Sequence, residues 1–453
     1  KEDSGRAPKA DLAWYVRAWG QWVLDHARKD LAKFYPTYAD FEALPLTTKD
    51  TKGGIQPKPF EKRPMQLVPI KKDGTPDIEA LNKSFSKDYL VDKTNPRWVA
   101  KSTAAYLWAR AVKCKNCRAE VPLLKTRWLC KKDKKRVLLA MVPDAQRAGV
   151  VFSIEPNVPV KGGNAAQSRE HDKRIAAGTM SKSGAKCPCC GTIMEMEDIR
   201  LEGKAGRLAS TMIAVVVDGA NGKEYRLPTS HEIQQAEAAQ ASLSDLFSQI
   251  PFGLPEEPLP NAEALGFRVP LYGFTQWKKL FTPRQLLALG TFVKWTREAK
   301  KEQNKYSAEW REALGAYSTC IISRTADYMT QLCVCENGAE EIKHLFMRWA
   351  LPITWDFAEA NPFTPSERFF AGGIKSAWRV ISNLHEGSWV DTVAPKVLNR
   401  SAITGGDDTY DLVFTDPPYY DAIPYSDLMD FFYLWLRRSI ADLGPEFTDN
   451  FKN

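Results

Sequence analysis

The sequence predicts an α/β protein with a small inserted β module and a helical region. Three observations predict this fold. Short apolar runs of strand length lie between residues 105 and 226, stretches with three-to-four apolar spacing flank them, and short apolar runs alternate with turns and helical stretches from residue 351 onward. The 453 residues are 44% hydrophobic and 26% charged, which excludes a wholly disordered or fibrous chain. No apolar run approaches the roughly 20 residues of a membrane helix, so we expect no membrane partner.

Helices are expected where apolar residues recur every three to four positions. Residues 11–35 show this pattern and end before Pro36. Residues 282–305 and 307–334 each begin with a hydroxyl side chain that can cap a helix. A further helical stretch is expected at 232–247.

Composition divides the chain into five segments. In order they are a helical segment (1–47), a loop-rich insertion (48–100), the β module (101–226), a linker with a helical region (227–348) and an α/β region (349–453). Within the β module, Lys161 to Gly184 is rich in Gly, Ala and Ser and is expected to be a mobile excursion. The sequence opens without a methionine or a signal peptide, so we expect it to be part of a longer protein.

The positive charge is concentrated in one window. Residues 101–150 hold 13 Lys and Arg against three acids, a net charge of +10 in a chain whose total is +8. Such clustering is typical of a partner that is a polyanion, such as DNA. The alternative for the densest run, Lys131 to Arg136, is a solvated hairpin tip.

Two Cys-x-x-Cys pairs predict a metal site, formed by Cys114 with Cys117 and by Cys187 with Cys190. Two tight turns can aim four thiolates at one zinc ion, in a closed site whose role is structural. The 69 intervening residues are tolerable because loop-closure entropy grows slowly with length. Cys189 could replace Cys190, and four unrelated core cysteines are the alternative. Nine cysteines are too few for a disulfide scaffold, which indicates a reducing compartment such as the cytoplasm.

A second motif follows an apolar run. Residues 410–415 read as a buried strand of a parallel sheet, and the turn after them is Asp416-Pro417-Pro418-Tyr419. Ligands bind beyond the carboxyl ends of such strands. An aromatic-rich helix is expected at 426–439. The alternative is a proline-rich turn that begins with an aspartate by chance.

In an α/β sheet that binds a nucleotide-like cofactor, a glycine-rich loop is expected after another apolar strand, where the backbone comes close to the cofactor. The candidate is Phe369 to Gly373, but Thr, Ser and charged residues precede it instead of a strand. It therefore reads mainly as a loop-to-helix junction before a helix at 371–384, and we expect the cofactor-binding half to lie upstream of Lys1.

Several segments resemble the adenine-specific DNA methylases that contain a zinc ribbon. They are Ala105 to Arg110, Arg268 to Phe274, Phe281 to Leu289, Trp355 to Phe363 and Tyr410 to Arg438. The resemblance implies a Rossmann-like methyltransferase catalytic half with an inserted zinc-ribbon module. It also implies S-adenosylmethionine as methyl donor, adenine in DNA as substrate, and a place in restriction-modification or phage defence.

The resemblance carries roles to particular residues. It implies catalysis by Asp416, Pro417, Pro418 and Tyr419 and structural zinc on Cys114, Cys117, Cys187 and Cys190, and it assigns no cofactor-binding residue. Our added hypothesis is that the β module grips DNA through Lys131, Lys132, Lys134 and Lys135. A competing interpretation is a zinc-ribbon nucleic-acid-binding module without its own activity, and a weaker one is methylation of RNA or of a protein glutamine.

Overall fold

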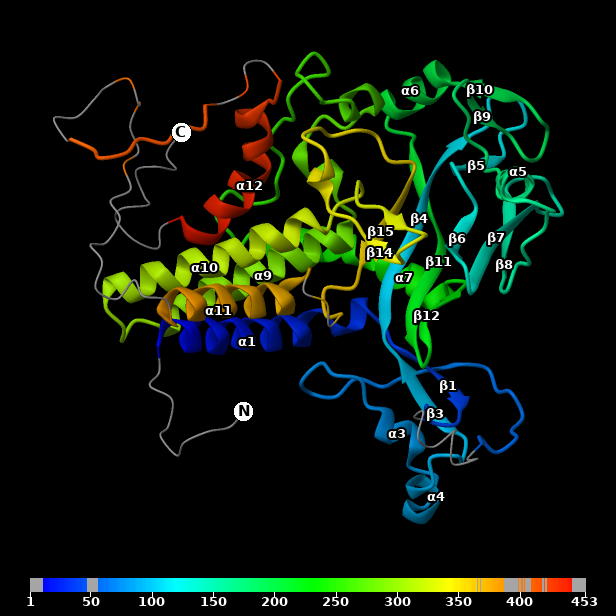
Figure 1. Ribbon diagram of the computed structural model, residues 1–453, viewed down its shortest axis with the longest axis horizontal. Coiled ribbons are helices and arrows are strands. Elements are labelled where there is room, and N and C mark those ends of the chain that lie inside the picture. The colour runs from blue at the N-terminus through cyan, green and yellow to red at the C-terminus, as the bar shows by residue number, and fades with distance from the viewer. Residues whose placement is uncertain are drawn as a thin grey trace.

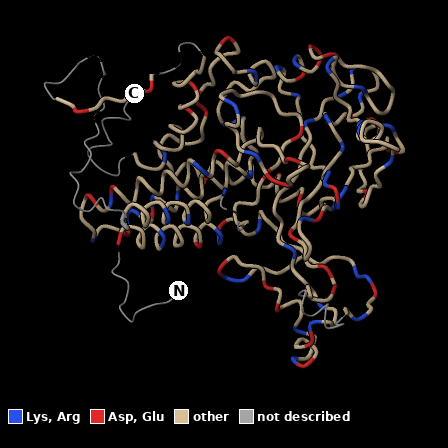
Figure 2. The backbone as a smooth tube through the Cα atoms, viewed as in Figure 1, with Lys and Arg blue, Asp and Glu red and all other residues tan. Residues whose placement is uncertain are grey.

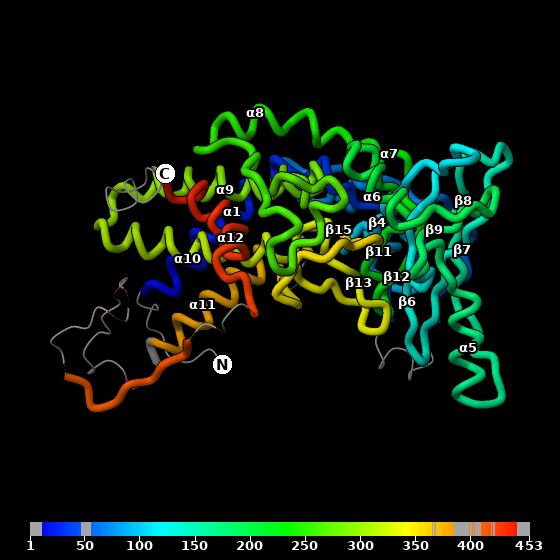
Figure 3. The backbone as a smooth tube through the Cα atoms, turned by 90° about the horizontal axis from the view of Figure 1, so that it is seen from above, coloured from blue at the N-terminus to red at the C-terminus, as the bar shows by residue number. Residues whose placement is uncertain are grey.

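The computed structural model combines a bundle of long helices with antiparallel sheets (Figure 1). It describes residues 11–46, 56–364, 366, 368–386, 398, 401, 403, 409–417, 419 and 422–441. Seen from above, the long helices occupy one end of the molecule, and strands β6 to β8 with helix α5 occupy the other (Figure 3). Mixed helix and strand content confirms the α/β prediction at this coarse level.

The bundle is built from helices of 16 to 20 residues, which are α1 (Leu12–Leu31), α9 (Pro283–Glu302), α10 (Ala308–Asp327), α11 (Phe370–Glu386) and α12 (Tyr425–Ile440). Each of the first three has a side-chain cap, because Asp11, Thr282 and Ser307 accept hydrogen bonds from backbone N–H groups in the first turn. Helices α1, α9 and α10 confirm the helices predicted from apolar spacing, although α10 ends at Asp327 and not near residue 334.

The central sheet is organised around the long strand β4 (Thr103–Lys113). One edge pairs with β11 (Ala209–Gly219), which pairs in turn with β12 (Gly222–Arg226). The other edge pairs first with β15 (Asp356–Ala360) and then with β5 (Glu120–Leu123). Every pairing between the named strands of the described residues is antiparallel, so the described part of the chain contains no parallel sheet.

A second antiparallel sheet comprises β6 (Trp128–Lys132), β7 (Lys135–Pro143) and β8 (Val150–Glu155). The excursion expected at 161–184 contains helix α5 (Ala165–Ile175), which its composition did not indicate. Asn164 caps this helix, and its buried Asp172 binds Arg136 of β7. Composition alone could not show this docking contact.

The predicted loop-rich insertion joins β1 (Tyr38–Glu42) in a small unit of its own. Its elements are β2 (Gln66–Leu67), α3 (Ile78–Asn82), α4 (Lys87–Val91) and β3 (Arg97–Lys101). A separate small core of Ala39, Phe41, Val68 and Trp98 holds the unit together. Elements of two to five residues are too short to produce a readable periodicity, which explains why the sequence indicated loops.

The remaining elements connect these parts. Among the described residues they are β9 (Gly184–Lys186), β10 (Ile193–Glu195), α6 (Met196–Lys204), α7 (Ser230–Ala238), α8 (Leu243–Phe247), β13 (Cys335–Glu336) and β14 (Glu341–Ile342). Short 3₁₀ turns lie at Ala32–Phe34, Ala239–Ser242, Val269–Tyr272, Trp277–Leu280 and Leu345–Met347. The single helix expected at 232–247 is therefore divided between α7 and α8.

Candidate metal centre and the acidic turn

Four cysteines converge as the sequence predicted. The Sγ atoms of Cys114, Cys117, Cys187 and Cys190 all lie within 4.8 Å of one another. Cys114 Sγ is 3.7 Å from Cys190 Sγ, and Cys117 Sγ is 3.7 Å from Cys187 Sγ. Four sulfurs held about 2.3 Å from a tetrahedral zinc ion would be about 3.8 Å apart. A disulfide would instead bring two sulfurs to about 2.05 Å. The cluster therefore has the size of a four-thiolate site that can hold a metal ion such as zinc.

The two Cys-x-x-Cys turns have the same backbone conformation. In each, the N–H of the first cysteine donates to the carbonyl five residues later, at 2.8 Å for Cys114 and 2.9 Å for Cys187. In each, the fourth residue after that cysteine has a positive φ, 63° at Arg118 and 79° at Gly191. Glycine adopts this conformation without strain, whereas arginine does so at a cost. The repeated geometry indicates a matched pair of turns that can direct four thiols at one ion, and not four unrelated core cysteines.

Each turn is the tip of a hairpin. The first joins β4 to β5, where Lys113 pairs with Glu120, and the second joins β9 to β10, where Lys186 pairs with Ile193. The sheet β6–β8 and helix α5 occupy the chain between them. The long separation in sequence is thus a folded insertion.

Cys189 does not belong to the cluster. Its side chain is buried, and its thiol donates to the carbonyl of Gly149 at 3.2 Å. The sequence left Cys189 and Cys190 as alternative ligands, and the structure places Cys190 with the other three.

The four thiols have unequal environments. Burial raises the pKa of Cys187 to about 12. A hydrogen bond between Cys190 Sγ and Thr192 Oγ1 (3.3 Å), with one from the Thr192 backbone, lowers the pKa of Cys190 to about 5. A buried thiol loses its proton readily only when a cation replaces it, so metal binding at this cluster would release protons. Four protein ligands would leave no open coordination position on a tetrahedral ion held there.

The lysine-rich run forms a hairpin tip whose charges are partly neutralised by two acidic residues, Asp172 and Glu340. The ion pairs are Lys131 with Asp172 (3.1 Å), Lys132 with Glu340 (2.7 Å) and Lys135 with Glu340. More widely, basic and acidic residues are interspersed over the molecule (Figure 2). Three of the four lysines that we expected to bind DNA therefore form ion pairs within the fold. The sequence could not show this, because their acidic partners lie at residues 172 and 340.

The acidic turn is exposed, and the strand predicted before it is absent. Residues 409–417 have no regular secondary structure and are exposed, with Phe414 at 89%. Asp416 is also exposed, as is Tyr419 at 65%, whereas Pro418 lies outside the described residues. An apolar run becomes a strand only when a neighbouring strand satisfies its backbone, and no described strand pairs with this one. The prediction of a buried strand at 410–415 was wrong for these residues.

Helix α12 follows the turn directly and is firmly packed. Phe431 and Trp435 are fully buried, and the Arg438 guanidinium donates to Glu257 (2.7 Å) and to the Gly253 carbonyl (2.8 Å). The predicted aromatic-rich helix is confirmed, and it fixes the chain a few residues beyond Tyr419.

The glycine-rich candidate at 369–373 is a loop-to-helix junction. Helix α11 begins at Phe370, whose ring stacks on Phe292 with centroids 4.3 Å apart. A Cβ at Gly373 would lie 2.9 Å from Ile321 Cγ2, so this glycine allows two helices to approach. Within the described part of the chain, this segment does not fit a cofactor loop.

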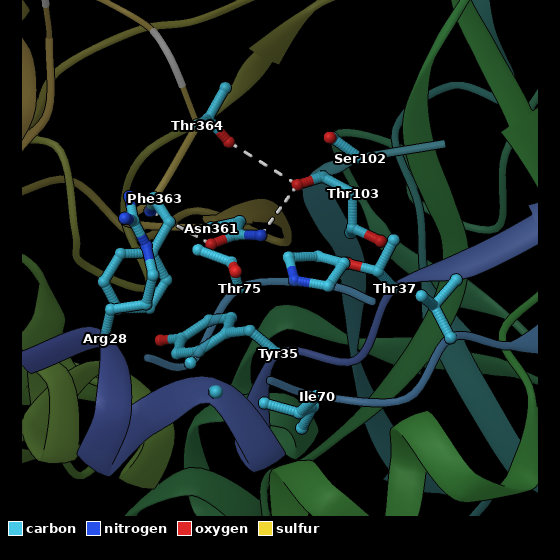
Figure 4. Close-up of a pocket in the computed structure, with 14 residues that line it drawn as sticks. Arg28, Tyr35, Thr37, Ile70, Thr75, Ser102, Thr103, Asn361, Phe363 and Thr364 are labelled. Carbon is cyan, nitrogen blue, oxygen red and sulfur yellow. Dashed lines mark hydrogen bonds between the residues drawn. The ribbon is translucent and has the colours of Figure 1, made fainter. Parts of the chain in front are cut away.

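The segment 355–363 was singled out by the resemblance without a physical role, and the structure supplies one. Glu359 accepts from Arg284 Nε (2.7 Å) and from Trp108 Nε1 (2.8 Å) at the centre of the core. Asn361 lines a cavity of about 260 Å³, where it and Thr364 both donate to the Thr103 carbonyl (Figure 4). The Asn361 side chain is occupied by structural hydrogen bonds.

Comparisons of the chain with models of protein families, with curated proteins and with solved structures found no match. No helix in the described part of the chain is both long and apolar enough to span a membrane.

Proposed function

We propose that the protein is an S-adenosylmethionine-dependent methyltransferase that acts on the exocyclic amine of adenine in DNA, with a Rossmann-like catalytic region. The observation that carries the proposal is the sequence Asp416-Pro417-Pro418-Tyr419 immediately ahead of an aromatic-rich helix. The four-cysteine cluster is proposed to hold structural zinc.

The residue types of the turn suit this chemistry. An exocyclic amine is a poor nucleophile because its lone pair is delocalised into the base. The Asp416 carboxylate and the Pro417 carbonyl can each accept one N–H of the amine, which localises the lone pair on nitrogen. Tyr419 offers an aromatic face for a base turned out of the duplex. No described residue is assigned to the methyl donor.

Two features of the described residues support access to this turn. Asp416 and Tyr419 are exposed, so neither side chain is occupied by packing. The packed helix α12 starts six residues after Tyr419 and restrains the downstream end of the turn. An accessible acceptor is what binding of an amine at this turn requires.

The experiment is methyl transfer from labelled S-adenosylmethionine to adenine-containing DNA by the full-length protein. Asp416→Asn should lower the rate by about 100-fold or more, because it replaces an acceptor with a partial donor. Tyr419→Phe should retain most activity and Tyr419→Ala should lose it, if the ring stacks on the base. Asp411→Asn, in the same exposed segment, is the matched control. Equal rates for wild type and Asp416→Asn would reject the role of the turn.

A second candidate is a zinc-ribbon nucleic-acid-binding module without catalytic activity. The assembled cysteine cluster favours it, since the described residues bring a metal site together but present no cofactor loop. It predicts DNA binding that Cys187→Ser abolishes, with no methyl incorporation by the wild-type protein. Incorporation that depends on Asp416 would exclude this candidate.

A further inference from the structure

One fully buried arginine lacks a counter-charge. Arg110, Arg284 and Arg438 are the three fully buried arginines of the described residues. Arg284 pairs with Glu359 at 2.7 Å, and Arg438 pairs with Glu257 at 2.7 Å. No described carboxylate forms an ion pair with Arg110, which is 2% exposed. Burying a charge without compensation is costly, so this exception calls for a physical reason.

Neutral groups hold the Arg110 guanidinium in place. Its Nε donates to the Thr354 carbonyl at 2.7 Å, and its two terminal nitrogens donate to the Gln331 side-chain oxygen (3.0 Å) and backbone carbonyl (3.2 Å). It lies over the ring of Phe274 at 4.6 Å and that of Phe357 at 5.3 Å. A guanidinium has five N–H groups, and these three bonds leave two of them for another acceptor. The group is oriented but not neutralised.

A cavity of about 290 Å³ opens onto this arginine. Ser210 lies directly opposite Arg110 in the β11–β4 register, and it also lines the cavity. Lys279 is exposed at the rim, where its ammonium donates to the Gly273 carbonyl (2.9 Å) and to Thr275 Oγ1 (3.3 Å). No residue that lines the cavity is acidic. The cavity thus brings two cations and a hydroxyl together with no negative charge.

The wall of the cavity is closely packed where α6 meets the turn after Tyr272. Its α6 side approaches the turn after Tyr272 backbone to backbone, since a Cβ at Gly203 would lie 2.5 Å from the Tyr272 carbonyl oxygen. Gly273 has a φ of 85°, and a Cβ there would lie 2.1 Å from the Gly203 oxygen. The last carbonyls of α6 accept from the following N–H groups, as in the bond from Gly206 to Gly203 (2.9 Å). The Gly203 carbonyl is therefore already used as an acceptor within the fold.

We propose that this cavity binds a phosphate group. Guanidinium and ammonium donors together match a phosphate dianion, and a hydroxyl donor opposite the arginine adds a third contact. The phosphate has two sources with the same chemistry, a free phosphate or mononucleotide and the backbone of a nucleic-acid strand. The site is separate from the turn at 416–419, and its test does not depend on methyl transfer.

The test measures binding of inorganic phosphate, adenosine monophosphate and a single-stranded oligonucleotide by calorimetry at fixed ionic strength, with chloride as the reference anion. Lys279→Gln and Ser210→Ala, both at exposed positions, should each weaken phosphate binding about three- to tenfold. Lys278→Gln is the matched control, because that neighbouring lysine pairs with Glu256 at 2.6 Å and does not line the cavity. Arg110→Met should abolish binding, and circular dichroism would establish whether that variant folds.

The three ligands distinguish between the two possible sources of the phosphate group. Competition between phosphate and the oligonucleotide, weakened in Lys279→Gln, identifies a strand-backbone contact. Binding of phosphate and the mononucleotide alone identifies a small-molecule site. The proposal is overturned if phosphate binds the wild type no more strongly than chloride does, or if Lys279→Gln and Ser210→Ala bind it like the wild type.

Discussion

Removal of one clustered thiol should release a metal ion, whereas removal of the adjacent thiol should not. Cys187→Ser takes away a buried member of the four-sulfur cluster. Cys189→Ser changes a buried thiol two residues away that bonds to Gly149 instead. The two variants are matched in chemistry, burial and position, and they differ in membership of the cluster.

The expected size of the effect follows from the geometry. Two of the six sulfur separations, Cys114–Cys190 and Cys117–Cys187, are 3.7 Å, and a regular tetrahedron with that edge has its centre about 2.3 Å from each vertex, which is the zinc–thiolate bond length. Four such bonds provide an apparent binding free energy of about 10–16 kcal/mol in small zinc domains. Loss of one ligand should therefore remove the ion at micromolar protein and destabilise the two hairpins by at least about 3 kcal/mol.

The assay is metal content by mass spectrometry after purification, followed by X-ray absorption at the zinc edge. Wild type and Cys189→Ser should hold about one ion per chain with four sulfurs near 2.3 Å. Cys187→Ser should be empty and should melt at a lower temperature. A full metal content in Cys187→Ser, or an equal loss in Cys189→Ser, would refute the assignment of ligands.

Two further predictions concern packing and charge. Gly203→Ala places a Cβ 2.5 Å from the backbone oxygen of Tyr272 and should lower the free energy of unfolding by about 1–3 kcal/mol, whereas Gly338→Ala, with no atom within 4 Å, should change it little; urea unfolding measures both. Hydrogen bonds from Arg136 lower the pKa of Asp172, so the pair stabilises the fold above the ordinary pKa of about 3.9 and this contribution is lost as the pH falls through the lowered value. Asp172→Asn should cost about 3 kcal/mol at pH 7, and the difference from wild type should shrink below about pH 4; a constant difference would contradict the linkage.

Local patterns were predictable from the sequence because local physics produces them. A Cys-x-x-Cys spacing fixes two sulfurs within one turn, and both turns adopt the expected form. Helix starts were also predictable, since Thr282 and Ser307 cap through hydrogen bonds that span three residues. The contacts that bring these local units together involve residues far apart in the sequence, so no short stretch of sequence predicts them.

The errors came from contacts between distant parts of the chain. The strand expected at 410–415 needed a neighbouring strand that no described residue supplies. The helix at 165–175 was missed because its anchor, the bond from Arg136 to Asp172, spans 36 residues. In both cases the local composition was described correctly. The residues that determine whether the segment forms a strand or a helix lie elsewhere in the chain.

The basic window shows the same principle applied to function. Its +10 charge indicated an anionic partner, and the surface lysines at 131, 132 and 135 were the obvious candidates. Those lysines form ion pairs with Asp172 or Glu340 in the fold, which offsets part of their charge. Arg110 lies in the same window and is less conspicuous in sequence, yet it is a fully buried cation for which no described carboxylate forms an ion pair. A binding site is better sought where positive charge is left uncompensated than where it is most frequent, because only uncompensated charge gains a new partner without losing an old one.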